Sequence, residues 1–274
     1  MGIASSRLLT RTSKVKSDGG VKVSLGLAKG VRPLAQQTDP FNVAAVPATA
    51  EALAYSTEDS GEEKTTSWRR HLTQGGGKIS FWHDVPLSAQ GKLYHAVIEI
   101  PRLTTAKMEM ATTEGGACMK QDTKKGKLRD YAIPIEWNYG AFPQTWEQPD
   151  HAWLGLEGCN GDNDPLDIVD LSSEAVACGA VITVKPLGVL AMIDEGEVDW
   201  KVLVVNAADP RAALCDSLAD CEVHFPGQIT RVREWFTWYK AVDGAPGVGP
   251  LGSNRLADKE PNVFGFGGEA LDAA

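Results

Sequence analysis

Apolar residues gather in short segments through the middle of the chain, from about Trp68 onward. Gly, Pro and Asp separate these segments, as turn residues do between strands. The segments most like strands are KISFWHDV (78–85), LYHAVIEI (93–100), AKMEM (106–110), KLRDYAI (127–133), LDIVDL (166–171), AVITVKPLGVLAMI (180–193) and WKVLVVN (200–206). Many short strands of this kind predict a barrel or a sandwich.

Helical patterns come late in the chain. Asp209-Pro210 combines a helix cap with a first-turn proline and predicts a helix through about Cys221. Pro226 opens a second segment, in which apolar residues recur at helical spacing. They are Ile229, Val232, Phe236 and Tyr239. Gly244 to Gly252 reads as a Gly/Pro loop, so the pattern as a whole predicts a mainly β domain with flanking helices (α+β).

Composition places the chain among globular proteins. Of its 274 residues, 43% are hydrophobic and 23% charged, which excludes disordered, collagen-like and disulfide-scaffold classes. No apolar run approaches the roughly 20 residues of a membrane-spanning helix, so we expect a soluble protein. The five cysteines include no Cys-x-x-Cys pair and are expected to be reduced. A net charge of −9 argues against nucleic-acid binding.

The first forty residues differ from the rest because they are basic and contain scattered Ser and Thr. Such composition is typical of an organelle transit peptide, although a disordered basic arm is an alternative. Met1 to Ser6 also fits the N-myristoylation pattern, and residues 41–60 resemble a linker. We therefore expect a disordered leader and linker over residues 1–60 and a single folded domain over 61–274. The basic residues of the leader are Arg7, Arg11, Lys14, Lys16, Lys22, Lys29 and Arg32.

An acidic cluster lies within a stretch, Asp130 to Val184, that contains no Lys or Arg. In GDNDPLDIVD (161–170), Asp162, Asp164 and Asp167 fall within six residues. Two like charges about 4 Å apart repel by roughly 4 kcal/mol at an effective dielectric of 20, so converging carboxylates need a cation, a proton or full solvation. Oxygen ligands of this kind select a hard cation such as Mg²⁺.

Two alternatives exist for this cluster. An EF-hand loop requires Asp or Asn at its fifth position and Gly at its sixth, which here are Leu166 and Asp167, so that interpretation fails. A solvated acidic turn stays open on the loop alone, because Asp, Asn and Pro are turn formers.

A second acidic cluster weakens the solvated-turn interpretation. In DEGEVDWK (194–201), a β-turn would let Asp194 end one strand while Asp199 and Lys201 begin the next, with side chains on one face of the sheet. Cations occur in a third region, where Lys107 and Glu109 alternate along one strand and Lys127 and Arg129 lie on another. Cations that face a metal-filled acidic cleft predict an anionic ligand such as phosphate.

Other motif matches fail on context. Gly247 to Gly252 fits G-x-G-x-x-G but lies in a Gly/Pro loop, and Gly77-Lys78 and Gly126-Lys127 lack the other residues of a P-loop. The five histidines show no metal-ligand spacing.

The segments GDNDPLDIVD, AMIDEGEVDWK, VIEIPR-x₄-KMEM, QDTKKGKLR and NYGAFPQTWE, read in order, resemble the soluble inorganic pyrophosphatases of the eukaryotic type within family I. The resemblance runs from about His83 to Lys240 and is strongest to the plastid branch. It implies an OB-like five-stranded closed barrel with the active site at its mouth, Mg²⁺ as cofactor, and pyrophosphate and phosphate as ligands. It also implies a monomer or a homodimer, with no nucleic-acid or membrane partner.

The resemblance further implies roles for individual residues. Asp162, Asp167 and Asp199 would hold the tightest Mg²⁺, and Asp194 and Glu109 would join Asp199 at metals that arrive with the substrate. Asp164 would be the general base for a water shared by two metals. Lys107, Arg129, Tyr139, Lys201, Tyr239 and Lys240 would bind the phosphoryl groups, and Glu99 and Glu147 would be supporting carboxylates.

The chain departs from the family pattern in three places. The connection from Arg129 to Asn138 is shorter, and Ile135 stands where many members carry an active-site tyrosine, whose role should therefore be dispensable. The loop after Gly244 is longer, and the family's terminal helix is missing after the chain's end at Ala274.

The sequence thus predicts Mg²⁺-dependent hydrolysis of pyrophosphate to two orthophosphates. The alternatives are a catalytically weak paralogue that only binds metal and phosphate, and a calcium-binding regulatory module. A plastid location is favoured, with a mitochondrion or a lipidated cytosolic form as alternatives.

Overall fold

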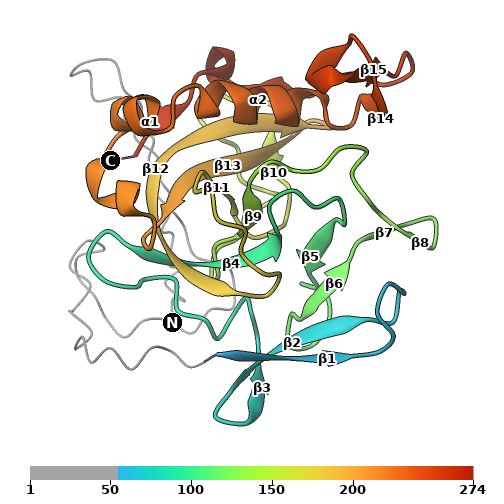
Figure 1. Cartoon of the computed structure of the whole chain (residues 1–274), viewed down its shortest axis with the longest axis vertical. Helices are drawn as coiled ribbons and strands as arrows, with labels where there is room; N and C mark the ends of the chain where they lie inside the picture. The colour runs from blue at the N-terminus through green and yellow to red at the C-terminus, as the bar shows by residue number, and fades with distance from the viewer. Residues whose placement is uncertain (1–54, 274) are drawn as a thin grey trace, which may run out of the picture.

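The computed structural model describes residues 55–273 and is mainly β, with the α-helices together on one side (Figure 1). Five strands pair in a circuit, each hydrogen-bonded to the next. In pairing order they are β4 (Tyr94–Ile100), β9 (Asn138–Ala141), β11 (Asp167–Asp170), β13 (Glu197–Asn206) and β12 (Val181–Asp194), which returns to β4.

The circuit is uneven. β12 pairs with β13 over Val184 to Asp194 but with β4 only over Val181 to Val184. The expected mainly β fold is therefore present, whereas these uneven pairings do not define the OB-like five-stranded closed barrel that the resemblance implied.

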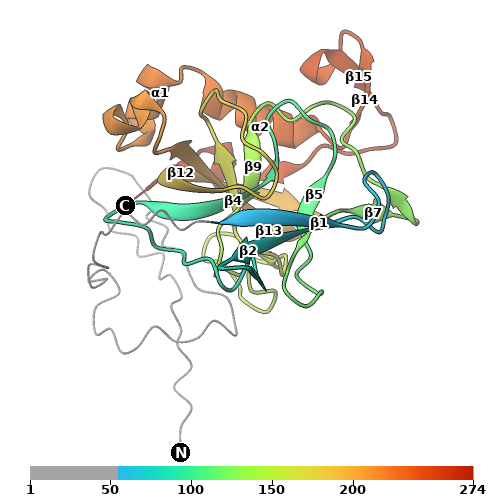
Figure 2. The ribbon, with the colours of Figure 1, turned by 60° about the horizontal axis from the view of Figure 1, so that its bottom comes forward.

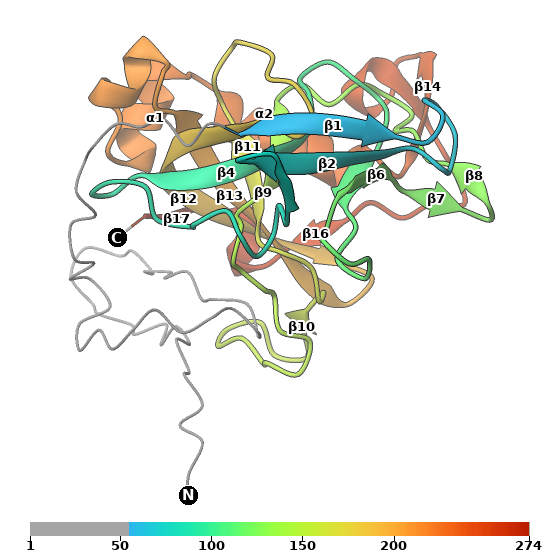
Figure 3. The ribbon, with the colours of Figure 1, turned by 90° about the horizontal axis from the view of Figure 1, so that it is seen from below.

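A second sheet lies on the opposite side from the helices (Figure 1). It consists of β1 (Ser56–Ser60), β2 (Arg69–Gln74), β6 (Met119–Gln121) and β5 (Met108–Met110), with β3 (Gly77–Ile79) on β2. β1 runs beside β2 along its whole length (Figure 3). The folded unit thus includes residues 56–60, which the sequence placed in the linker, whereas the basic leader lies outside the described residues.

Short elements complete the molecule. The hairpin of β7 (Thr123–Lys124) and β8 (Lys127–Leu128) projects at one end (Figure 2). β10 (Asn160–Gly161) pairs with β13, and both β16 (Val263–Phe264) and β17 (Leu271–Asp272) pair with β12. β14 (Val242–Pro246) and β15 (Ser253–Arg255) pair with each other, and η2 (Pro250–Gly252) and η3 (Phe266–Gly268) are short 3₁₀ helices.

The helices lie where the sequence predicted them, except that one predicted helix is divided into two. The segment expected to run from Pro210 to Cys221 is a 3₁₀ helix, η1 (Pro210–Leu214), followed by α1 (Leu218–His224), because Ser217 caps a new helix by accepting the Asp220 N–H. α2 (Gln228–Trp238) has the predicted apolar face. The Gly/Pro loop is shorter than expected because β14 extends to Pro246.

Strand predictions were right for four of the five ring strands, missed β9 and were wrong for two segments. β4, β11, β12 and β13 lie where the alternation placed them. In KISFWHDV only Lys78 and Ile79 are in a strand, because the Ser80 and Asp84 side chains cap a turn. In KLRDYAI the strand ends at Leu128.

Alternation along β13 sends its side chains to two cores. Trp200, Val202 and Val204 pack in one core. Leu203 and Val205 pack in the other, together with Val232, Trp235 and Phe236 of α2. Asp199 and Lys201 have the same parity as Leu203, so they lie on the face that α2 covers. No helix among residues 55–273 is long and apolar enough to cross a bilayer.

Candidate active site

The predicted hairpin is present and brings the second acidic cluster to the first. β12 and β13 meet at Asp194 and Glu197, and the turn residues Glu195 and Gly196 both have positive φ, as a two-residue hairpin requires. β11 runs parallel to β13 with Asp167 opposite Lys201. The carboxylates therefore converge at the starts of two neighbouring strands.

Lys201 is the centre of this arrangement. It is 1% exposed, and its ammonium lies 2.5 Å from Asp167 Oδ2, 3.0 Å from the Tyr139 hydroxyl and in contact with Asp199. Burial alone would lower the pKa of Lys201, but Asp167 and Asp199 raise it well above its ordinary value. Lys201 is therefore a permanent cation inside the site.

Three carboxylates surround one point beside this lysine. Glu147, Asp162 and Asp199 each place an oxygen within 4.8 Å of the others. Glu147 Oε1 accepts the N–H of Trp200 at 3.1 Å, while its Oε2 is buried with no partner among the described residues. Burial raises the pKa values of Asp162 and Asp199 to about 7; repulsion by Asp199 adds to the shift of Asp162, whereas at Asp199 the attraction of Lys201 opposes the shift and Asp167 adds to it. Carboxylate oxygens around a point, one of them unpartnered, fit a hard divalent cation.

This triad differs from the expected ligand set. Asp162 and Asp199 belong to it, but its third member is Glu147, which the sequence cast as a supporting carboxylate. Asp167 lies beside the triad and is hydrogen-bonded by Tyr139 and Lys201.

The acidic loop is held in place by Glu147 itself. The Glu147 N–H donates to Asp164 O and its carbonyl accepts from Asn163, both at 2.9 Å. Asn163 has φ +76°, and Asp162 Oδ1 accepts the Asp164 N–H at 3.0 Å. The Asp164 carboxyl is solvent-accessible, yet the surrounding protein and then Glu109 raise its pKa.

A group of cations lies across from the acids. Lys107 donates to Glu109 at 3.1 Å and to Asp122 at 3.0 Å, and Arg129 lies 2.5 Å from the same Asp122 oxygen. Asp122 was missed in the sequence because it looked like part of a lysine-rich turn. Lys127, expected beside these cations, is instead exposed on β8.

Two predicted residues at the end of α2 reach the site. Lys240 pairs with Asp194, whose other oxygen is buried and unpartnered among the described residues. Tyr239 lies close enough to Lys201, Asp194 and Asp199 for their charges to act on its pKa. The end of α2 and the triad therefore belong to one site.

Glu99 has a supporting position. It is 6% exposed and accepts the Met110 N–H at 2.7 Å, which ties β5 to β4. Burial and then Asp167 raise its pKa well above its ordinary value.

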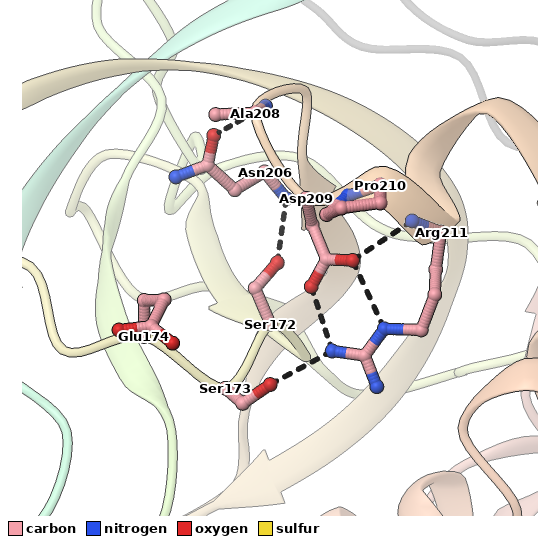
Figure 4. A pocket seen from close by; sticks show the side chains of 8 residues that line it. All are labelled: Ser172, Ser173, Glu174, Asn206, Ala208, Asp209, Pro210 and Arg211. Atoms are coloured by element: carbon pink, nitrogen blue, oxygen red, sulfur yellow. Dashed lines mark hydrogen bonds and ion pairs between the residues drawn. The ribbon is translucent and has the colours of Figure 1, made fainter.

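A separate hollow lies at the far ends of β11 and β13 (Figure 4). It has a volume of about 250 Å³. The guanidinium of Arg211, which lines the hollow, already donates to both carboxylate oxygens of Asp209 and to the Ser173 hydroxyl. The hollow therefore offers no free cation to an anionic ligand. Its lining residues are Ser172, Ser173, Glu174, Asn206, Ala208, Asp209, Pro210 and Arg211.

Comparison with known proteins agrees with this geometry. Residues 96–260 match the model of the inorganic pyrophosphatase family. The chain is 46% identical over 247 residues to soluble inorganic pyrophosphatase 1, chloroplastic, of Chlamydomonas reinhardtii, covering 88% of each protein. It is also 46% identical over 208 residues to soluble inorganic pyrophosphatase 6, chloroplastic, of Arabidopsis thaliana, covering 75% of this chain and 67% of that protein.

A solved structure has the same fold. The type I inorganic pyrophosphatase of Toxoplasma gondii superposes with a TM-score of 0.71 at 41% identity, covering 80% of this chain and 92% of that one. The chain therefore belongs to the inorganic pyrophosphatase family, in the eukaryotic type of the soluble family I enzymes.

Proposed function

We propose that this protein is an inorganic diphosphatase that hydrolyses pyrophosphate to two orthophosphates with Mg²⁺. The observation that carries the proposal is the triad of Glu147, Asp162 and Asp199 around one point, with the buried cation Lys201 at its side. A cluster of acids fits a metal, and adjacent cations fit the anionic ligand that the metal would bridge.

Glu147, Asp162 and Asp199 would hold one Mg²⁺, with Asp167 beside them, and Asp194 and Glu109 would hold others. When bound, Mg²⁺ would lower the pKa of a water and neutralise negative charge on the phosphates. Asp164 would take the proton from the attacking water, and its accessible carboxyl beside the acidic cluster supports this role.

The substrate's phosphoryl groups would lie among Lys107, Arg129, Lys201 and Lys240, with Tyr139 and Tyr239 as neutral donors. Lys107 and Arg129 share Asp122, which fixes both cations at one edge of the site. Positioning of this kind is the main contribution that a protein makes to phosphoryl transfer.

Phosphate release from pyrophosphate tests the proposal. Purified protein with Mg²⁺ should release phosphate, and Asp164→Asn should lower kcat by about 10²- to 10⁴-fold. Asp258→Asn, at an exposed position, is the matched control and should match the parent. A parent without activity would favour the weak metal- and phosphate-binding paralogue, and activity supported by Ca²⁺ rather than Mg²⁺ would favour the calcium-binding module.

We also propose the finer features that the sequence predicts. The five-strand circuit would act as an OB-like barrel, and residues 1–60 would be a transit peptide and linker ahead of a catalytic domain over 61–274. The named chloroplastic relatives support a plastid location over a mitochondrion or the cytoplasm. The protein would be a monomer or a homodimer. Mass spectrometry of the native N-terminus tests the leader, because a mature chain that retains a myristoylated Gly2 would contradict import.

A further inference from the structure

A tyrosine that the family pattern did not single out lies in the site. Tyr131 follows Arg129 in the shortened connection, and its N–H donates to Thr105 O at 2.7 Å. Its ring meets those of Trp235 and Tyr239 edge-on, with centroids 5.3 and 5.5 Å away. These contacts fix the direction of the phenol.

The hydroxyl of Tyr131 has no hydrogen-bond partner among residues 55–273. Lys107 and Lys201 are both near enough to act on it electrostatically. The hydroxyl of Tyr139, by contrast, donates a hydrogen bond to Asp167 and accepts one from Lys201. Tyr131 is only partly buried and its hydroxyl is not sealed from solvent, so a ligand that enters the site can accept a hydrogen bond from it.

We propose that the Tyr131 hydroxyl donates a hydrogen bond to a phosphoryl oxygen of pyrophosphate held between Lys107 and Lys201. This inference rests on the proposed function and adds one substrate-binding residue to it. Phosphate oxygens are strong acceptors, and a neutral donor binds them without adding another positive charge that would repel the metals.

Tyr131 stays a donor across the working pH range. Burial raises its pKa far above its ordinary value, although Lys107 and Lys201 oppose this. The position also bears on the replaced tyrosine of the family pattern. Ile135 is fully buried in the core, so residue 135 has no access to the ligand, and Tyr131 supplies a phenol from a different point of the chain.

Tyr131→Phe tests the inference because it removes only the hydroxyl and keeps the ring contacts. A hydrogen bond to a charged group contributes about 1.5–3 kcal/mol, so kcat/KM for pyrophosphate with Mg²⁺ should fall about 10- to 100-fold. The melting temperature and the pH at maximal rate should stay those of the parent. Tyr94→Phe is the matched control, since Tyr94 packs edge-on against Phe142 in the other core and should leave kcat/KM unchanged.

Calorimetric binding of imidodiphosphate with Mg²⁺ separates this inference from the proposed function. If the parent binds the analogue but does not hydrolyse pyrophosphate, the proposed function fails, and weaker binding by Tyr131→Phe would still support the contact. If Tyr131→Phe binds the analogue and turns over pyrophosphate within twofold of the parent, or if the parent does not bind the analogue, the inference is wrong.

Discussion

The ammonium of Lys201 lies 2.5 Å from Asp167, and the two residues occupy the same register position on parallel neighbours β13 and β11. Side chains at matching positions of paired strands project to one face. The pairing of the strands thus determines the pairing of the charges, and Lys201 compensates two carboxylates, the buried Asp199 and the partly buried Asp167.

Replacing this lysine should destabilise the fold. Lys201→Met leaves the buried Asp199 and the partly buried Asp167 without their cation, so the free energy of unfolding at pH 8 without metal should fall by about 3–5 kcal/mol. Lys78→Met is the control, because Lys78 forms an exposed pair with Glu58 at 3.7 Å and should cost under about 1 kcal/mol. Urea unfolding checks both, and equal losses would contradict the role given to Lys201.

Glu147 should be a metal ligand rather than a supporting residue. Glu147→Gln replaces one carboxylate of the triad by a neutral amide, so Mg²⁺ affinity measured by calorimetry should fall about tenfold or more. Glu157→Gln, at an exposed position, should leave it unchanged. If Asp167→Asn abolishes Mg²⁺ binding and Glu147→Gln does not affect it, the ligand set expected from the sequence is the right one.

Mg²⁺ binding should release protons near neutral pH. Burial raises the pKa values of Asp162 and Asp199 to about 7, so at pH 6 both hold protons that a cation must displace. Calorimetry in buffers of different ionisation enthalpy should find proton release at pH 6 and little at pH 8.5.

The same shifts make metal-free stability fall as pH rises. The folded-state pKa values exceed the unfolded value of 3.8, so the contribution is complete below about pH 4 and lost as pH rises through about 7. Mg²⁺ should therefore raise the melting temperature more at pH 8 than at pH 5.5. An equal rise at both pH values would contradict the buried triad.

Asp122 should position the phosphate-binding cations. Its carboxylate holds Lys107 and Arg129 together, so Asp122→Asn should raise KM for pyrophosphate about tenfold by loosening both side chains. Asp130→Asn, an exposed neighbour, serves as the control. Steady-state kinetics that found KM unchanged would assign the cations' placement to other contacts.

Local sequence patterns were enough to predict part of the site. The hairpin at Glu195-Gly196 and the parity of Asp199 and Lys201 follow from turn chemistry and alternation. The parallel pairing of β11 with β13 joins segments about thirty residues apart, and no local pattern specifies it.

Residues that act through distant contacts were harder to predict. Glu147 enters the triad because its backbone pins the acidic loop, and a lone acid after Trp146 gives no sign of this. Tyr131 lies in a segment that reads as a strand but is not one, so its direction could not be inferred from alternation. Family resemblance supplied roles for matching positions only, and Tyr131 has no match in the quoted motifs.

The most direct test of the central claim is diffraction from crystals of this protein soaked in Mn²⁺, a hard cation with an anomalous signal that selects similar oxygen ligands. We predict an anomalous peak within about 2.5 Å of carboxylate oxygens from Glu147, Asp162 and Asp199. Crystals with no peak at that point, or with peaks only on unrelated surface acids, would contradict the account.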